Sequence, residues 1–227
     1  MTWRDVTIKQ FEEVQKASNL GLDETDLTIL ICQILFPNEY FDLSTPYSKI
    51  KKYSIAINNL GDIKDLLSDV ESLKEVDIEG VKLVFKTQIE QITTSEYMDL
   101  AAFLKKKASI VDILSVICDK KDRDLLEKLD CVTALSLYSR TIDNLGKIHQ
   151  NFGQLFQPSD PEDDTPSTNR LSKWGILPYV MKVVEITNTK LDEVFDMPIC
   201  EVFYLTCYQL DVDKLQKEQL EKWKRQH

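Results

Sequence analysis

The chain has 227 residues, of which 43% are hydrophobic and 29% charged, a composition typical of a globular protein. Its formal net charge of −10 argues against nucleic acid and anionic membranes as partners, because both require a basic face. The sequence contains no run of 18 apolar residues, and MTWRDVTIKQ at its start lacks the apolar region of a signal peptide. We therefore expect a soluble protein that works inside a cell.

Polar caps and helix terminators divide the chain into helices. Six glycines and seven prolines are few for this length, which favours long helices over many short strands. Pro37 and Gly61 are the expected ends of two helices, and a short helix is expected over residues 62–73. The expected caps are Thr7 with Gln10, Asp23, Thr45 before Pro46, and Thr93 with Glu96.

The segment KEVDIEGVKLVFKT differs from its surroundings because it is rich in β-branched residues. Glu79 and Gly80 separate two extended runs, and glycine can adopt the positive φ of a tight turn. We expect a hairpin that pairs Glu75–Ile78 with Val81–Lys86. A two-stranded ribbon is marginal alone, so this hairpin, with its two potentially open edges, must pack on helices or pair with another strand.

The second half of the sequence returns to helical patterns. Residues 122–156 predict one long helix or two, and residues 211–227 predict a charged helix with a basic last turn. Leu177-Pro178 predicts that a helix begins or kinks at the proline. The expected buried face of the first segment is Leu135, Tyr138, Ile142, Leu145, His149 and Phe152, which recur at steps of three and four.

The expected fold is mainly α, a helical bundle with one small β-hairpin. Residues 1–156 are the expected helical body, with the hairpin near residues 75–86. Residues 157–169 are an expected linker, because they contain three prolines, four acids and no large apolar residue. Residues 170–227 are the expected C-terminal helices, which pack back on the body.

The sequence shows no motif for catalysis or metal binding. Its two histidines form no zinc motif, and it has no phosphate-binding loop, dinucleotide fingerprint or nucleophile elbow. We therefore expect no enzymatic activity, cofactor, metal or small-molecule substrate, with an undetected enzyme as an alternative. The cysteines at 32, 118, 131, 200 and 207 form no CxxC pair and are expected as buried, reduced thiols.

Aromatic residues crowd the two ends of the sequence. Val202–Leu205 are four consecutive apolar residues that point all round a helix, so one side must face a second surface. That surface is another helix of the same fold or another subunit, and core packing is the alternative use of these rings. The candidate partner-binding residues are Trp3, Phe11, Trp174, Tyr179, Phe195, Phe203, Tyr204 and Tyr208.

Both ends also resemble a known family. TWRDVTIKQFEEVQK, Thr2–Lys16, resembles the opening TW-[KR]-D-[IV]-T-[LI]-x-Q-[FY]-x-E-[IV] of small tail-region proteins, often tail-assembly-chaperone-like, of Bacteroidetes-infecting double-stranded DNA phages. A hairpin followed by EYMDLAAFL, Glu96–Leu104, keeps the family's order of elements. KLDEVFDMPICEVFYLTCY, Lys190–Tyr208, is similar to its closing x-D-x-V-x-x-[LM]-P-[IVL]-x-[ED]-[FVC] segment. The resemblance spans the chain in outline and is specific at the two ends.

The resemblance implies a non-enzymatic virion protein of the tail or head–tail junction, which is assembled in the host cytoplasm as an oligomeric ring or adaptor component. Its implied partners are copies of itself and other phage tail or portal-region proteins, with no membrane and no sequence-specific nucleic acid. The acidic linker and the charged C-terminal helix depart from the short members of the family, which favours a structural role. Two alternatives stay open: a tail-assembly chaperone absent from the mature particle, and an unrelated intracellular protein-binding module.

Overall fold

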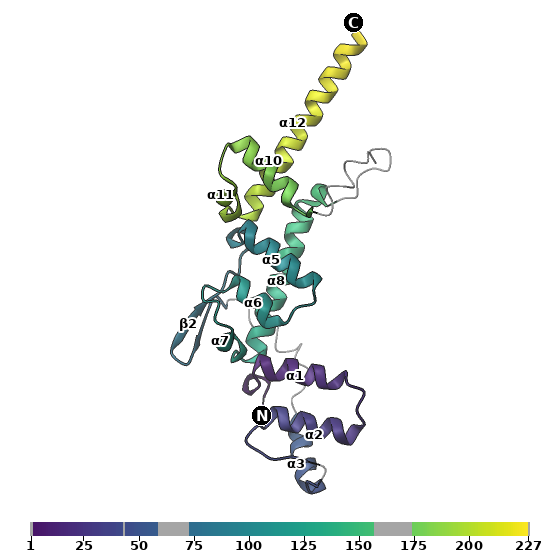
Figure 1. Cartoon of the computed structure of the whole chain (residues 1–227), viewed down its shortest axis with the longest axis vertical. Coiled ribbons are helices and arrows are strands. Elements are labelled where there is room, and N and C mark those ends of the chain that lie inside the picture. Colours follow the sequence, from purple (N-terminus) through teal and green to yellow (C-terminus); the bar gives the residue numbers. More distant parts are fainter. Residues whose placement is uncertain (1, 43, 59–72, 157–173, 227) are drawn as a thin grey trace. The chain divides into compact units, whose positions relative to one another are not determined.

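The computed structural model describes residues 2–42, 44–58, 73–156 and 174–226 (Figure 1). Within these ranges the chain forms ten α-helices, three short 3-10 helices and one two-stranded antiparallel hairpin. The prediction of a mainly α fold with one small hairpin is confirmed. The predicted linker, the helix end at Gly61 and nearly all of the helix predicted over residues 62–73 lie outside the described residues.

The described chain forms two compact units that interleave along the sequence. Unit 1 comprises Met1–Thr87 and Phe103–Thr141, and unit 2 comprises Gln88–Ala102 and Ile142–His227. The domains expected from the sequence are instead consecutive stretches of chain. In the structure, a segment from the first half of the chain belongs to the same unit as the C-terminal helices.

Unit 1 combines helices with the hairpin, and unit 2 is helical throughout its described residues. The elements of unit 1 are η1 (Trp3–Asp5), α1 (Ile8–Ser18), α2 (Glu24–Leu35), α3 (Tyr47–Asn58), β1 (Glu75–Ile78), β2 (Val81–Val84), α6 (Ile110–Ile117), α7 (Arg123–Glu127) and the first half of α8 (Cys131–Asn151). Those of unit 2 are η2 (Ile89–Gln91), most of α5 (Thr94–Lys105), the rest of α8, η3 (Gly153–Leu155), α10 (Leu177–Thr187), α11 (Leu191–Asp196) and α12 (Ile199–Gln226).

Three of the predicted helix caps are confirmed. At the start of α1, the Thr7 hydroxyl accepts the N–H of Gln10 at 3.3 Å, and the Gln10 side chain accepts the N–H of Thr7 at 3.0 Å. Thr93 and Glu96 form the same reciprocal pair at the start of α5. Asp23 caps α2 by accepting two backbone N–H groups of its first turn, each at 2.9 Å. Each cap satisfies N–H groups that the helix itself leaves unpaired.

The predicted cap at Thr45 is wrong. Helix α3 begins after Pro46, whose carbonyl accepts the N–H groups of Lys49 and Ile50. The Thr45 hydroxyl instead accepts the N–H of Asp42 at 2.8 Å. It therefore closes the turn that precedes α3, because a threonine hydroxyl can bond backwards as well as forwards.

The predicted buried face of α8 is confirmed at Leu145, wrong at His149 and only half-buried at its other four residues. His149 is exposed, and of the predicted set only Leu145 is buried. The buried residues of α8 between 134 and 148 are Ala134, Leu137, Thr141, Asn144, Leu145 and Ile148. Two of them are polar, and Thr141 can be buried because its hydroxyl donates to the carbonyl of Leu137 at 2.8 Å. A count of apolar residues alone therefore misses the polar part of the buried face of this helix.

In unit 1 the first residues of α1 and α8 pair through their backbones. Ile8 donates its N–H to the carbonyl of Leu129, and Cys131 donates its N–H to the carbonyl of Val6, both at 2.8 Å. The N–H groups at a helix start have no partner within their own helix. This short antiparallel bridge satisfies one such group of each helix and fixes the two helix starts against each other.

Unit 2 repeats this pairing between α5 and α12. Thr94 donates its N–H to the carbonyl of Met197, and Ile199 donates its N–H to the carbonyl of Ile92, both at 2.9 Å. The bridging residue before α12 is Pro198, which lacks an N–H and so loses no hydrogen bond there. The Met-Pro step of the sequence therefore joins two helix starts that are about a hundred residues apart.

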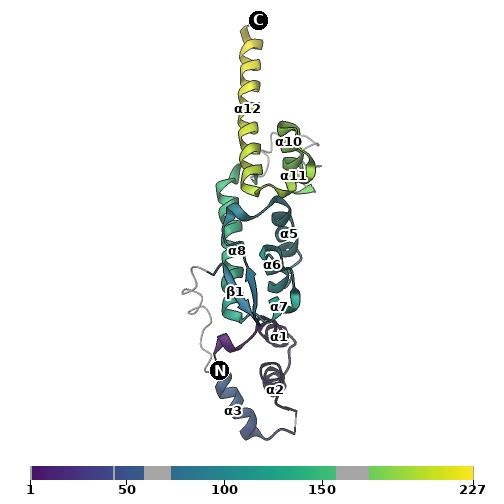
Figure 2. The same cartoon turned by 90° about the vertical axis from the view of Figure 1, so that its left-hand side faces the viewer.

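The two units also share their order of elements (Figures 1 and 2). In each, a 3-10 helix and a capped helix come first, as η1-α1 and as η2-α5. A helix, a short helix and a long helix follow later in the chain, as α6-α7-α8 and as α10-α11-α12. Leu126 of α7 and Val194 of α11, four residues before the respective bridge, are both fully buried. The units are thus two versions of one arrangement, to which unit 1 adds α2, α3 and the hairpin.

The predicted hairpin is confirmed at its turn. Glu79 and Gly80 have φ values of 53° and 80°, as a two-residue turn with positive φ at both positions requires. Strand β2 ends at Val84, two residues earlier than predicted, because Phe85 forms a bridge with Cys118.

A substitution at Gly80 should show how strongly this turn specifies the hairpin. We expect Gly80→Val to lower the free energy of unfolding by about 1–2 kcal/mol, because a β-branched residue disfavours positive φ. Urea denaturation followed by circular dichroism measures this loss. The control is Gly146→Ala in α8, where an added Cβ meets nothing within 4 Å and we expect a gain of about 0.5–1 kcal/mol. Equal free energies of unfolding for Gly80→Val and the wild type would contradict the claim that the positive φ of Gly80 specifies this turn.

Candidate interaction surfaces

Phe203 lies at the centre of an aromatic cluster in unit 2. Its side chain is fully buried, and four rings approach it edge-on. The centroids of Tyr97, Phe156 and Phe152 lie 5.5, 5.5 and 5.6 Å from that of Phe203, and the centroid of Tyr179 lies at 6.3 Å. The prediction that Phe203 contacts a partner is therefore corrected, since this residue belongs to the core of its own unit.

The polar atoms of this cluster bond within unit 2. The Tyr97 hydroxyl lies 2.8 Å from Nε2 of His149, whose ring stacks on Phe156 with centroids 4.3 Å apart. Burial raises the pKa of Tyr97 to about 12. The Tyr179 hydroxyl donates to the carbonyl of Leu155 at 2.7 Å, and burial raises the pKa of Tyr179 as well. Both phenols therefore stay protonated at neutral pH and orient the helices.

Phe203 and its neighbour Tyr204 should respond very differently to truncation. We expect Phe203→Ala to lower the free energy of unfolding by about 3–5 kcal/mol, because it leaves a cavity among four rings. The matched control Tyr204→Ala, at a side chain that is 70% exposed, should change it by less than about 0.5 kcal/mol. Chemical denaturation of the two variants tests this, and similar losses would contradict the assignment of the buried side of α12.

The opposite side of α12 is an open face that carries two of the predicted partner-binding residues. Tyr204 and Tyr208 are 70% and 63% exposed, on the side away from the buried Val202 and Thr206. Further along, residues 214–225 are all exposed, and Figure 1 shows this part of α12 extending beyond α10 and α11. We name residues 214–226 the α12 tail. Its large exposed apolar side chains are Leu215, Leu220 and Trp223.

Trp3 and Phe11 come together in unit 1. Their rings meet edge-on with centroids 5.9 Å apart, and both side chains are half-buried. The Trp3 carbonyl accepts a hydrogen bond from the thiol of Cys131 at 2.9 Å, and burial raises the pKa of that thiol to about 12. These two predicted residues therefore form one partly open apolar surface at the start of α1.

The remaining predicted residues stand apart from this surface. Trp174 is 55% exposed. Phe195 is half-buried and lines an open hollow of about 330 Å³ between α5 and α11. The other residues that line the hollow are Ser95, Met98, Asp99, Asp192 and Asp196. Across the described residues, no group of three His, Cys, Asp or Glu side chains could hold a metal ion, so these aspartates do not converge on one point.

The prediction that the five cysteines are buried is confirmed for three of them and wrong for Cys200 and Cys207. Cys32, Cys118 and Cys131 are buried, whereas Cys200 and Cys207 are half-buried. Burial raises the pKa of Cys118 to about 11, which keeps this thiol protonated and unreactive at neutral pH.

No helix in the described ranges combines the length and apolar character needed to cross a bilayer.

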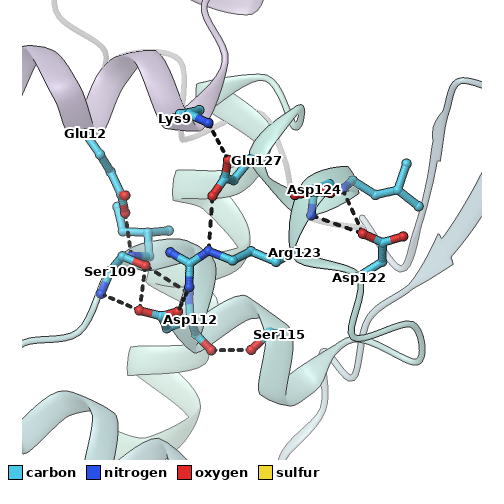
Figure 3. Close-up of polar contacts among 11 residues, drawn as sticks. Lys9, Glu12, Ser109, Asp112, Ser115, Asp122, Arg123, Asp124 and Glu127 are labelled. Carbon is cyan, nitrogen blue, oxygen red and sulfur yellow. Dashed lines mark hydrogen bonds and ion pairs between the residues drawn. The ribbon is translucent and has the colours of Figure 1, made fainter.

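A network of ion pairs in unit 1 was not expected from the sequence (Figure 3). Glu127 of α7 accepts hydrogen bonds from Lys9 of α1 at 2.8 Å and from Nε of Arg123 at 3.0 Å. Arg123 also pairs with Asp112 of α6. Only the Arg123–Glu127 pair has a sequence signal, the spacing of four residues on a helix. The other contacts depend on how three helices meet.

The network continues at the start of α6. Glu12 accepts the N–H of Ile110 at 2.6 Å, and Ser109 caps the helix by accepting the N–H of Asp112 at 3.1 Å. Both interactions place acceptors at the positive end of the helix dipole. Since Glu12, Asp112 and Glu127 each accept at least one hydrogen bond, these three carboxylates serve to orient the helices.

The network should make unit 1 sensitive to acid. Hydrogen bonds from Lys9 and Arg123 lower the pKa of Glu127. For Asp112, burial acts to raise the pKa, but the Ser109 hydrogen bond and the Arg123 charge leave it lowered. A lowered folded-state pKa means that the unfolded chain binds more protons. The stabilisation is therefore complete above the ordinary carboxyl range, about pH 4–4.5, and is lost as the pH falls through the lowered values.

We accordingly expect Glu127→Gln to lower the free energy of unfolding at pH 7. Between about pH 5 and pH 3, the free energy of unfolding of this variant should fall less steeply than that of the wild type. The loss should be modest, about 1 kcal/mol, because these ion pairs are partly exposed. Urea midpoints measured across this pH range provide the test. Glu218→Gln on the α12 tail is the control, and an equal flattening in both variants would contradict the role of the network.

The outer edge of β2 in the hairpin is covered, contrary to the expectation of two open edges. Along the outer edge of β2, Val84 donates its N–H to the Asp119 carboxylate and accepts the N–H of Asp119 at its carbonyl, both at 2.9 Å. Among the described residues, no strand pairs with the outer edge of β1, where Glu75 and Asp77 are exposed. A four-residue edge with two acids is a poor template for strand addition.

Comparisons of the chain with protein-family models, curated proteins and solved structures found no match. The resemblance to phage tail-region proteins therefore stays a prediction. In the structure, its two patterned segments hold the bridge residues Thr7 and Pro198 and the buried Val194. These patterned positions therefore coincide with residues that determine the fold.

Proposed function

We propose that the chain is a non-enzymatic structural protein of a phage particle. It resides in the virion at the tail or head–tail junction, as one copy of an oligomeric ring or adaptor. The observation that carries this proposal is the open face of α12 with its tail, where Tyr204, Tyr208 and Trp223 are each more than half exposed. Exposed apolar side chains gathered along one element are typical of a surface that a protein partner covers. The assignment to a phage rests on the resemblance of Thr2–Lys16 and Lys190–Tyr208 to phage tail-region proteins.

The partners in this proposal are copies of the same chain and other tail or portal-region proteins. Large aromatic side chains are enriched in protein interfaces, because a ring buries much area at little entropic cost. The net charge of −10 repels the phosphates of DNA, so a ring of such subunits lets DNA pass without gripping it.

Two measurements test this function. Mass spectrometry of purified particles of the phage that encodes the chain should detect it, and its absence would favour the assembly-chaperone alternative. Tyr208→Glu should leave the circular dichroism spectrum unchanged and block particle assembly, because it places a charge on the open face. Met181→Glu, at a side chain of α10 that is 49% exposed, is the control. Normal infectious particles from a folded Tyr208→Glu variant would refute the role of this face.

A further inference from the structure

The second half of α8 completes the core of unit 2. This helix leaves unit 1 after Thr141 and continues in unit 2, where Phe152 and Phe156 follow its end. Both rings contact Phe203, with centroids 5.6 and 5.5 Å away. His149, near the end of the same helix, contacts Tyr97, and the covered rings of Phe203 and Tyr97 are 0% and 4% exposed. A helix that starts in one unit thus supplies apolar side chains to the other.

Unit 1 has an equivalent of each covered residue. Tyr97 is the fourth residue after Thr93, the bridge residue that caps α5. In unit 1 the fourth residue after the equivalent Thr7 is Phe11, which is half-buried although Trp3 packs against it. Tyr97 and Phe11 are thus equivalent aromatic residues, and Phe11 is the less covered of the two.

The long helices give a second equivalent pair. Phe203 is the fifth residue after the bridge residue Pro198, and Leu135 is the fifth residue after the bridge residue Asp130. Phe203 is fully buried, whereas Leu135 is half-buried. The surface that the end of α8 covers in unit 2 is therefore partly open in unit 1, at two large apolar residues.

The α12 tail is the counterpart of the second half of α8. Both are the second halves of long helices, but the tail is exposed at every residue from 214 to 225. Counted from the respective bridge, Leu220 corresponds to Phe152, and Trp223 corresponds to Leu155. Phe152 is half-buried and Leu155 is buried, whereas Leu220 and Trp223 are 52% and 57% exposed. The tail thus carries large apolar side chains at the positions that correspond to Phe152, which contacts Phe203, and to the buried Leu155.

We propose that the α12 tail of one copy docks on unit 1 of a second copy. Leu220 and Trp223 then lie over Phe11 and Leu135, as the end of α8 lies over Tyr97 and Phe203 in unit 2. The donating and accepting surfaces differ, so the contact is heterologous, and repeated copies close into a ring or extend as an open chain. This contact rests on the self-association in the proposed function and names its two surfaces.

A rival contact is the antiparallel pairing of α12 with α12 of a second copy. Residues 199–213 contain three acids and no base, whereas the tail contains five bases and two acids. Antiparallel pairing would match these opposite charges. It uses α12 on both sides, however, and gives no role to Phe11 and Leu135, so variants of unit 1 separate the two contacts.

Complementary variants of the full chain test the proposal. The donor variant carries Leu220→Asp and Trp223→Asp, the acceptor variant carries Leu135→Asp, and the control carries Met181→Asp on α10. Sedimentation velocity should show assemblies larger than the 26.3 kDa monomer for the wild type and the control. Each defective variant alone should be monomeric. Their equimolar mixture should form a two-chain species, because it retains one intact donor and one intact acceptor.

Circular dichroism establishes that each variant is folded. If Leu135→Asp is not, Phe11→Ala takes its place and should weaken association by at least about tenfold. A monomeric wild type, or a mixture that stays monomeric, would overturn the proposal. Association of a folded acceptor variant at wild-type strength would overturn it in favour of α12 pairing with itself. These outcomes do not depend on finding the chain in particles, so the contact and the virion role can fail separately.

Discussion

The arrangement of the helices depends on one backbone interaction, the reciprocal pairing of helix starts. A helix start exposes N–H groups that its own turns cannot satisfy, and burying them unpaired would cost about 1–3 kcal/mol each. In unit 1 the starts of α1 and α8 satisfy each other, and in unit 2 those of α5 and α12 do so. Each pair joins segments that are more than a hundred residues apart in the chain. The compact units are therefore interleaved, because each must contain both members of its pair.

Packing around these bridges differs between the units. Unit 2 fills its interior with the rings around Phe203, and the two tyrosine hydroxyls in that cluster have hydrogen-bond partners. Unit 1 has a smaller aromatic cluster, in which Phe36 and Phe41 meet Tyr53 edge-on, and it orients α1, α6 and α7 with the ion pairs around Arg123 and Glu127. Apolar burial is the stronger source of stability, whereas partly exposed ion pairs mainly select one geometry.

The same arrangement explains why α12 has two contrasting sides. Its first half packs one side in the core of unit 2 and leaves Tyr204 and Tyr208 exposed, and its tail is exposed at every residue from 214 to 225. In the proposed assembly, the tail of one copy covers unit 1 of the next. That contact between copies would repeat the packing of the end of α8 in unit 2 within a single chain. The acidic outer edge of β1 discourages the addition of a strand from another chain. Contacts between copies are therefore expected to involve helices.

The partner-binding residues show where reasoning from the sequence succeeds and where it stops. The run Val202–Leu205 requires that one side of α12 face outward, and Tyr204 does so. The sequence could not tell that Phe203 faces inward, because four consecutive apolar residues have no polar side to mark the solvent. The repeat was equally hidden, since VTIKQF and ITTSEY share one identical residue, the bridge threonine, and the matching long helices come from distant segments.

The sequence by itself determined the local structure of this protein. Caps at Thr7, Asp23 and Thr93 and the turn at Glu79-Gly80 act over three or four residues, so neighbouring side chains suffice to specify them. Only the tertiary structure decided which face of α8 is buried, which helix starts pair and which aromatic residues reach the surface. These outcomes depend on contacts between segments far apart in the chain, and periodicity within one helix carries no information about what lies against it.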